Sequence, residues 1–355
     1  MLVFIIIFIL LIYGVQKWHC RHALKNINYD YTFSKQLLER GEAFKLVSTI
    51  TNESRRFIPF IRMEETLPQG IKPKKEKVEL QEDALGFLIY SSSIYLSPRS
   101  QLNRKLELTF PKRGCYEFFG ATLHGGDFFG MQEQKRKFEK NLEIIVYPNE
   151  MESAKLQEIM GGFLGDMSVR RFIMEDPILT VGAYEYTGRE PMKQISWKQT
   201  ARSQQMMVKR YDYTTELKVT VLLDVSGMTN NTTEPQDYEN CYAIARSVCQ
   251  HLLKKDIAFD FLSNAAANTH LKKVGKSQLK AILEHLGRGG HKAYETFEAL
   301  VEKVLLEPNP QRSILVISPK RDEEKIQLAN SLQKGQTTAV ALIWGEDYDD
   351  VDLAA

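Results

Sequence analysis

Asp224 and Ser226 are the residues whose types and spacing suggest the most specific chemistry in this chain. They directly follow the apolar run "VTVLL", a β-branched pattern that predicts a buried strand ending at these side chains. Carboxylate and hydroxyl oxygens are ligands that Mg²⁺ and Ca²⁺ prefer. The next alternate position is Met228, whose thioether is a poor ligand for a hard cation. The loop therefore offers two hard oxygen ligands at alternate positions and a thioether at the third.

Catalytic residue types show no comparable arrangement. The seven histidines are scattered, and none lies in a nucleophile elbow or an HExxH helix. His124 and His291 are better explained as surface or loop residues. The glycine-rich run at residues 287–290 is not followed by the Lys-Ser/Thr pair of a phosphate-binding loop, so a turn between helices explains it. We therefore expect no enzymatic activity, and a hydrolase is the least favoured alternative.

The elements that position Asp224 belong to the second of two regions. The chain has 355 residues, enough for about two domains. From residue 216 to 345 strands alternate with helices, which is typical of a mostly parallel sheet covered on both faces. Residues 27–148 instead contain alternating runs such as "GEAFKLVSTI" and "NLEIIVYP", which predict an antiparallel β-sandwich. The predicted fold class is mixed, with a β-sandwich followed by a doubly wound α/β domain.

Residues 149–215 connect these regions and are dense in charged and aromatic residues without a clear period. A flexible linker has no use for side chains such as Tyr184, Tyr186 and Trp197, so we expect this connecting segment to be ordered. Residues 346–355 form an acidic tail that we expect to be solvated.

The first sixteen residues, "MLVFIIIFILLIYGVQ", carry no charged side chain and, extended to Trp18, predict a membrane anchor at residues 1–18. The run reaches about 24 Å against a bilayer core of about 30 Å, so local thinning is needed. A cleaved signal peptide is the rival, but no basic residue precedes the run. Lys17, Arg21 and Lys25 follow it, which places the body of a single-pass protein in the cytoplasm.

The overall composition limits the classes of partner and the cellular compartment that we expect. A net charge of +2 gives no field that would recruit nucleic acid. The four cysteines form no CxxC pair, which is typical of reduced thiols in a cytosolic compartment. Those cysteines are Cys20, Cys115, Cys241 and Cys249.

With these residues in place, the chain resembles the bacterial family called "domain of unknown function 58". The family signature reads approximately Arg-Glu-Tyr, Gly-Asp, Ile-x-Trp and Thr-Ala-Arg, before a basic strand and the Asp-x-Ser loop. The resemblance covers roughly residues 100–260 and includes Glu185, Tyr186, Gly188, Ile195, Trp197, Thr200, Ala201, Arg202, Lys209 and Arg210. An earlier part of the pattern matches at Arg113, Gly114, Tyr116, Asp127, Phe129 and Gly130.

The chain also departs from the family pattern. Tyr184 stands where the signature has arginine, and Arg189 and Glu190 replace the acidic residues that usually follow Gly188. The second N-terminal membrane helix that is usual in the family is missing from this sequence. The chain is therefore similar to a divergent member of the family.

The resemblance implies a von Willebrand A-like α/β domain, whose metal site takes oxygens from three loops. In this chain the second loop reads Gly-Gly-His at residues 289–291, where a threonine is expected, and the third reads Ser-Pro at residues 318–319, where an acidic residue is expected. Thr229 or Thr296 could replace a missing oxygen only after a loop rearrangement. We therefore expect a degenerate site without a cofactor, Mg²⁺ or Ca²⁺ being the alternative, at Asp224 and Ser226.

The resemblance also implies association with a MoxR-type AAA+ ATPase. We expect a non-enzymatic, membrane-anchored adaptor or scaffold that works with such an ATPase on an unknown protein client, in protein maturation or an envelope-related process. The alternative is a metal-dependent adhesion receptor with its α/β domain outside the cell. Nucleic acid is not an expected partner.

The signature segment has two interpretations. In the favoured one, Trp197 is buried and Arg202 forms a buried ion pair, so that the segment clamps the two domains together. In the other, these side chains form a surface for a partner, with Glu185 or Glu190 as ion-pair partners. Tyr186 and Thr200 belong to the same candidate surface.

Overall fold

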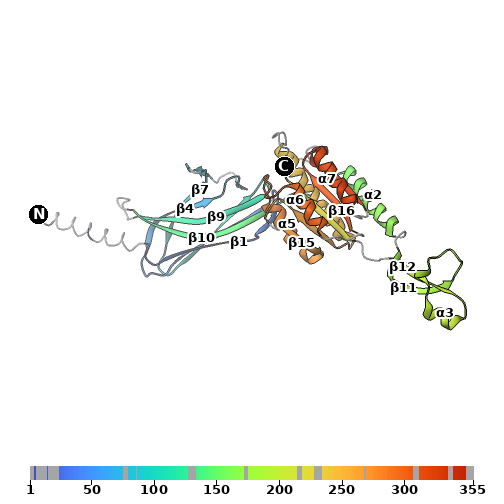
Figure 1. The fold of residues 1–355 in the computed structure, drawn as a ribbon. Coiled ribbons are helices and arrows are strands. Elements are labelled where there is room, and N and C mark those ends of the chain that lie inside the picture. The colour runs from blue at the N-terminus through green and yellow to red at the C-terminus, as the bar shows by residue number, and fades with distance from the viewer. Residues whose placement is uncertain are drawn as a thin grey trace. The chain divides into compact units, whose positions relative to one another are not determined.

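The chain folds into two compact units (Figure 1). The first contains residues Met1–Asn149 with Leu283–Arg288 and Ala355, and the second contains Glu150–Ile282 and Gly289–Ala354. The structure is a computed structural model, and besides Phe4 and Gly14 it describes residues 24–74, 79–84, 86–126, 133–171, 175–213, 218–227, 234–267, 269–306, 312–334 and 339–348.

Two sheets make up the first unit, and nearly all of their strand pairs are antiparallel. The smaller sheet has the order β1 (Ile27–Phe33), β3 (Phe44–Asn52), β8 (Gln101–Thr109) and β5 (Lys72–Pro73). The larger has the order β2 (Leu37–Glu39), β10 (Glu133–Tyr147), β9 (Gly114–Gly126), β4 (Ile58–Leu67), β7 (Leu88–Leu96) and β6 (Gln81–Glu82). Only β2, which lies beside β10, pairs in parallel among these strands.

The inner faces of the two sheets form a shared apolar core. Tyr31 and Phe44 from the smaller sheet join Phe118 and Ile144 from the larger one in a single cluster of buried side chains. Alternation along the strands causes this arrangement, since every second residue of β3 points inward. The first unit is thus the expected antiparallel sandwich.

The sheet of the second unit has the order β15-β14-β13-β16-β17. The central strand β13 pairs in parallel with β14 and β16, β17 lies parallel beside β16, and β15 is an antiparallel edge strand. Their bounds are β13 (Lys218–Leu223), β14 (Phe259–Ser263), β15 (Thr269–Val274), β16 (Arg312–Ser318) and β17 (Val340–Trp344).

Helices cover this sheet because its strands are apolar on both faces. Buried residues of α6 (Phe297–Leu305) and α7 (Glu323–Lys334) pack against β13, β14 and β16. A further helix, α4 (Pro235–Lys254), contacts β13 and β16. The remaining helical elements after β13 are η2 (Lys276–Gln278), α5 (Leu279–Arg288) and η3 (Gly345–Asp347).

The described residues of the connecting segment form elements of their own. It begins with α2 (Ala154–Arg171), an eighteen-residue helix. A β-hairpin follows, formed by β11 (Glu175–Glu185) and β12 (Met207–Tyr213) as a two-stranded antiparallel sheet. Between these strands lie η1 (Met192–Gln194) and α3 (Trp197–Ser203). We call residues 175–213 the signature hairpin.

The expected membrane anchor requires a correction. Within the described ranges, no helix is long and apolar enough to cross a membrane. This finding corrects the prediction of a membrane helix at residues 1–18 and the single-pass membrane location that was based on it. The physical weakness of that prediction was length, since the apolar run reaches about 24 Å rather than about 30 Å. Residues 1–18 themselves, Phe4 and Gly14 apart, lie outside the described residues.

Candidate functional site

Asp224 lies at the carboxyl end of the central strand β13, as its place after the apolar run predicts. Its backbone N–H donates to the carbonyl of Ile317 at 2.8 Å, which ties it to the end of β16. Its side chain is fully buried. One carboxylate oxygen, Oδ1, accepts hydrogen bonds from the Ser226 N–H at 2.9 Å, from the Ser226 hydroxyl, and from Asn264 Nδ2 at 2.7 Å.

The second carboxylate oxygen of Asp224 binds a buried cation from the same chain. Oδ2 accepts from the Ser318 hydroxyl at 2.8 Å and lies 2.6 Å from Nζ of Lys325, at the start of α7. The Lys325 side chain is 9% exposed and that of Asp224 is 0% exposed, so this is a buried salt bridge. Nζ also contacts the Ser226 carbonyl at 2.7 Å and Ser318 Oγ at 3.0 Å.

Asn264 joins the next loop to this network. It follows β14 and is buried, with Oδ1 accepting from the Val225 N–H at 2.8 Å. Its Nδ2 also contacts the Glu295 carbonyl at 3.1 Å, and its own carbonyl accepts from the Tyr294 N–H at 2.8 Å. The side chains of Asp224, Ser226, Asn264, Ser318 and Lys325 form one hydrogen-bonded group, which we call the strand-end cluster.

Of the other oxygens expected near the metal loop, Ser318 reaches the cluster. Thr296 instead caps the N-terminus of α6, where its hydroxyl accepts from the Ala299 N–H at 3.3 Å. His291 pairs with Glu239 at 2.8 Å and stacks on Tyr238 with ring centroids 5.0 Å apart. The two remaining candidates, Met228 and Thr229, lie outside the described residues.

These contacts do not fit a resident divalent cation. Every lone pair of the Asp224 carboxylate that points into the cluster already accepts a hydrogen bond or contacts an ammonium. A hard cation needs six or more oxygens, and Ser226 Oγ is itself turned toward Asp224 as a donor. A metal could enter only by displacing Lys325.

Ser318 and Lys325 lie 3.0 Å apart, which is within reach of a nucleophile and its base. A lysine must be neutral to accept a proton from serine, but this ammonium is paired with a buried carboxylate. Ser318 is also only 2% exposed, so a substrate does not reach it. The pair therefore has a structural rather than a catalytic arrangement.

The signature hairpin is held together by its own contacts. Ile195 and Val208 form an isolated bridge and are buried, with exposed fractions of 3% and 0%. Thr200 Oγ1 accepts from the Met207 N–H at 2.9 Å, and the Tyr186 N–H donates to the Met206 carbonyl at 2.8 Å. These contacts give Thr200 and the Tyr186 backbone roles in fixing the hairpin.

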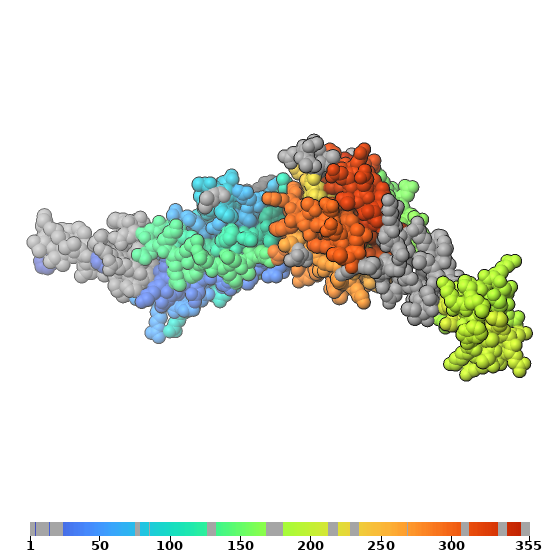
Figure 2. All heavy atoms as spheres, viewed as in Figure 1, coloured from blue at the N-terminus to red at the C-terminus, as the bar shows by residue number. Residues whose placement is uncertain are grey.

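Trp197 lies on the surface of the signature hairpin with 65% of its area exposed. Trp197 is thus not buried within the hairpin itself, and Arg202 and Glu185 are exposed as well. Five of the twelve large apolar side chains that are exposed among the described residues lie in this segment (yellow-green in Figure 2). They are Val181, Tyr184, Met192, Trp197 and Met206.

The same segment is basic. Between residues 185 and 210 there are six basic and two acidic side chains, a net charge of +4. The acidic residue Glu190 binds within the hairpin, where it accepts from the Thr187 hydroxyl at 2.7 Å and the Thr187 N–H at 3.1 Å. The hairpin thus combines exposed aromatic and apolar side chains with positive charge.

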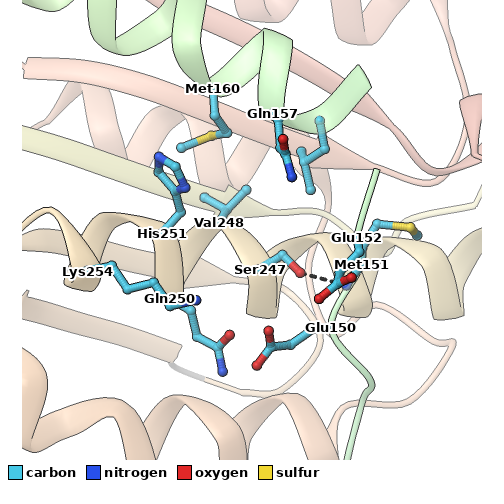
Figure 3. A pocket seen from close by; sticks show the side chains of 11 residues that line it. Glu150, Met151, Glu152, Gln157, Met160, Ser247, Val248, Gln250, His251 and Lys254 are labelled. Carbon is cyan, nitrogen blue, oxygen red and sulfur yellow. Dashed lines mark hydrogen bonds between the residues drawn. The ribbon is translucent and has the colours of Figure 1, made fainter. Parts of the chain in front are cut away.

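A separate groove lies between α2 and α4, with a volume of about 260 Å³. Figure 3 shows Gln157 and Met160 of α2 on one side and Val248 and His251 of α4 on the other. Burial, with help from Lys254 and Lys255, lowers the pKa of His251. The lining mixes acidic, basic and apolar groups and points to no one ligand.

Comparison with protein families gives a match to "Protein of unknown function DUF58" over residues 183–342. The matched residues contain most of the signature hairpin and the whole strand-end cluster. This part of the chain is similar to the DUF58 family. The match does not extend to residues 100–182, where family-like motifs such as those at Arg113 and Tyr116 were also expected. Asp127, Phe129 and Gly130 of those motifs lie outside the described residues.

Solved structures share only a limited likeness with this chain. A cohesin module of a Clostridium perfringens family 33 glycoside hydrolase is 14% identical, with a TM-score of 0.24, and the match covers 34% of this chain and 96% of the module. A CARDB domain from Pyrococcus furiosus is 9% identical, with a TM-score of 0.24 and coverage of 34% and 91%. The comparison with curated proteins gives no match.

Proposed function

We propose that this protein is a non-enzymatic adaptor that binds a MoxR-type AAA+ ATPase through its signature hairpin and presents a protein client to it. The exposed apolar side chains of the hairpin are the observation that supports this proposal. We infer the class of partner from the family resemblance and the binding surface from the exposed side chains of the hairpin.

The composition of the hairpin surface suits a protein partner. Trp, Tyr, Met and Arg are enriched in the centres of protein interfaces, and truncating an interfacial Trp often costs 2 kcal/mol or more. Trp197, Tyr184 and Met192 are all exposed on this segment. Its net charge of +4 between residues 185 and 210 favours an acidic patch on the ATPase.

The strand-end cluster speaks against the alternative of a metal-dependent adhesion receptor. Such a receptor bridges a partner carboxylate through a metal that is open to solvent. Asp224 is fully buried here and already paired with Lys325, so no described ligand of this edge is free to hold such a metal. We therefore propose binding through the hairpin rather than through the strand ends.

The test is a titration of the full chain against a purified MoxR-type ATPase, with wild type and Trp197→Ala compared. We expect the variant to bind at least about 30-fold more weakly, the equivalent of about 2 kcal/mol, because an exposed aromatic anchor is lost. Its melting temperature should stay within about 1 °C of wild type, since Trp197 contributes little to the core.

Tyr95→Ala is the matched control. Tyr95 lies on β7 of the sandwich and is 65% exposed, the same fraction as Trp197. This control should bind the ATPase as wild type does. Equal binding by Trp197→Ala and wild type, or a large loss of stability in Trp197→Ala, would contradict the proposal.

A further inference from the structure

The strand-end cluster contains its own positive charge, the ammonium of Lys325. This residue is far in sequence from the signature hairpin that we propose as the adaptor surface. We propose that the Lys325 ammonium is a tethered cation that takes the place of a divalent metal at the end of β13. This edge of the α/β sheet is then held closed by the chain itself and needs no Mg²⁺ or Ca²⁺.

The hydrogen-bond capacity of the ammonium is fully used. A lysine has three N–H donors and no acceptor. Nζ of Lys325 has three oxygens in reach, Asp224 Oδ2 at 2.6 Å, the Ser226 carbonyl at 2.7 Å and Ser318 Oγ at 3.0 Å. A buried charge is tolerated when it is paired and when its remaining donors are satisfied, and both conditions hold here.

The oxygens around Nζ are of the kinds that hold a hard cation. They comprise a carboxylate, a hydroxyl and a backbone carbonyl, from the loop after β13 and the end of β16. Carboxylate, hydroxyl and carbonyl oxygens are also ligands of Mg²⁺ and Ca²⁺. The ammonium therefore lies where the first and third loops would otherwise hold an ion.

The position of Lys325 on α7 explains why its ammonium lies at the strand ends. The buried residues among the described side chains of this helix are Lys325, Ala329 and Leu332, spaced at intervals of four and three. That spacing places them on one face, toward the sheet. Because the ammonium is covalently attached, its local concentration is high and neither dilution nor a chelator removes it.

As a consequence, hydrogen bonds in the strand-end cluster link the ends of three strands. Asp224 follows β13, Asn264 follows β14 and Ser318 ends β16, and all three meet through the Asp224 carboxylate. Removing the ammonium leaves a carboxylate buried without a counter-charge, which is among the most destabilising changes a core can suffer. It also leaves an oxygen-lined space that a free divalent cation can enter.

The test measures the melting temperature of the full chain in chelator, in millimolar Mg²⁺ and in millimolar Mn²⁺. Wild type should melt at the same temperature in all three. Lys325→Ala should melt at least about 5 °C lower in chelator, since a buried charge is unpaired. Mn²⁺ should raise the melting temperature of Lys325→Ala, because the ion restores the missing charge.

Lys303→Ala is the matched control for a lysine ion pair. Lys303 lies on the neighbouring helix α6 and contacts Glu295 at 2.6 Å, but its side chain is 41% exposed. A solvent-exposed pair contributes little, so this variant should melt within about 2 °C of wild type and should not respond to metal.

Asp224→Asn/Lys325→Met removes both charges while keeping the volumes similar. It should melt higher than Lys325→Ala and ignore Mn²⁺, because no buried charge remains. If Lys325→Ala does not fold, this double variant decides: a folded, metal-insensitive protein supports the proposal, and an unfolded one overturns it.

The proposal is also overturned if wild type responds to metal or chelator, if Lys325→Ala is as stable as wild type, or if Mn²⁺ does not stabilise Lys325→Ala. A failure of ATPase binding would leave all these results unchanged, so the two proposals fail separately.

Discussion

Tyr242 and Gly289 fix the loop that follows α5 against α4. Tyr242 is fully buried, and its hydroxyl donates to the Gly290 carbonyl at 2.6 Å. A Cβ on Gly289 would lie 2.4 Å from the Tyr242 hydroxyl oxygen, whereas the nearest atom to a Cβ on Gly290 is 3.9 Å away. Adjacent glycines of one sequence motif therefore have different physical roles.

Gly289→Ala should lower the free energy of unfolding by about 1–3 kcal/mol, because the new methyl group overpacks a buried ring. Gly290→Ala, one residue along, should change it by less than about 0.5 kcal/mol. Chemical denaturation of the full chain measures both. Equal effects of the two substitutions would contradict the packing that the structure describes.

The strand-end cluster shows what residue types reveal without a structure. Asp224 could be placed at a strand end because an apolar, β-branched run precedes it directly. Lys325 was missed, because a lysine near the start of a helix is ordinarily solvated. A weak signal existed, since Lys325 shares a helical face with Ala329 and Leu332. Its partner cannot be read from that face, because the two residues are separated by a hundred positions in sequence.

At the scale of elements, the signature hairpin contains one residue in an unfavourable backbone conformation. Gln204 follows α3 with φ of 60° and ψ of 7°, in the left-handed region that glycine adopts at little cost. This turn sends the chain from α3 into β12. The hairpin geometry therefore depends on a position that glutamine fits poorly.

Gln204→Gly should leave the hairpin more stable than Gln205→Gly by about 1 kcal/mol, because only the first substitution relieves backbone strain. The stability of the hairpin is measured by hydrogen exchange of the Tyr186 and Ser196 amides, because these amides donate to the carbonyls of Met206 and Met207. Faster exchange in Gln204→Gly than in Gln205→Gly would contradict this account of the turn.

Elements with strong apolar patterns were predicted well, and polar ones were not. The strand runs of the sandwich and of β13, β14, β16 and β17 carry buried residues at the expected spacing. The edge strand β15 was missed, because it is short and both Lys272 and Lys273 are exposed. The signature hairpin was missed as well, since Ile195 and Val208 are its buried apolar pair and give no sequence period.

At the scale of the whole molecule, the surface that we propose for partner binding and the buried ion pair of Asp224 and Lys325 lie in different parts of the chain. Exposed Trp197 and Tyr184 lie on the basic signature hairpin, while the carboxylate of Asp224 is buried in the strand-end cluster. The membrane helix that the sequence suggested has no counterpart among the described helices. We therefore propose an adaptor whose partner binding depends on Trp197 and not on a divalent cation.

The most direct test is the affinity of the full chain for a purified MoxR-type ATPase, measured calorimetrically without nucleotide, first in chelator and then in millimolar Mg²⁺. We predict saturable binding with the same Kd in both conditions, and a Kd that rises with salt because the segment that contains Trp197 is basic. The absence of binding, or binding that appears only with Mg²⁺, would contradict the account.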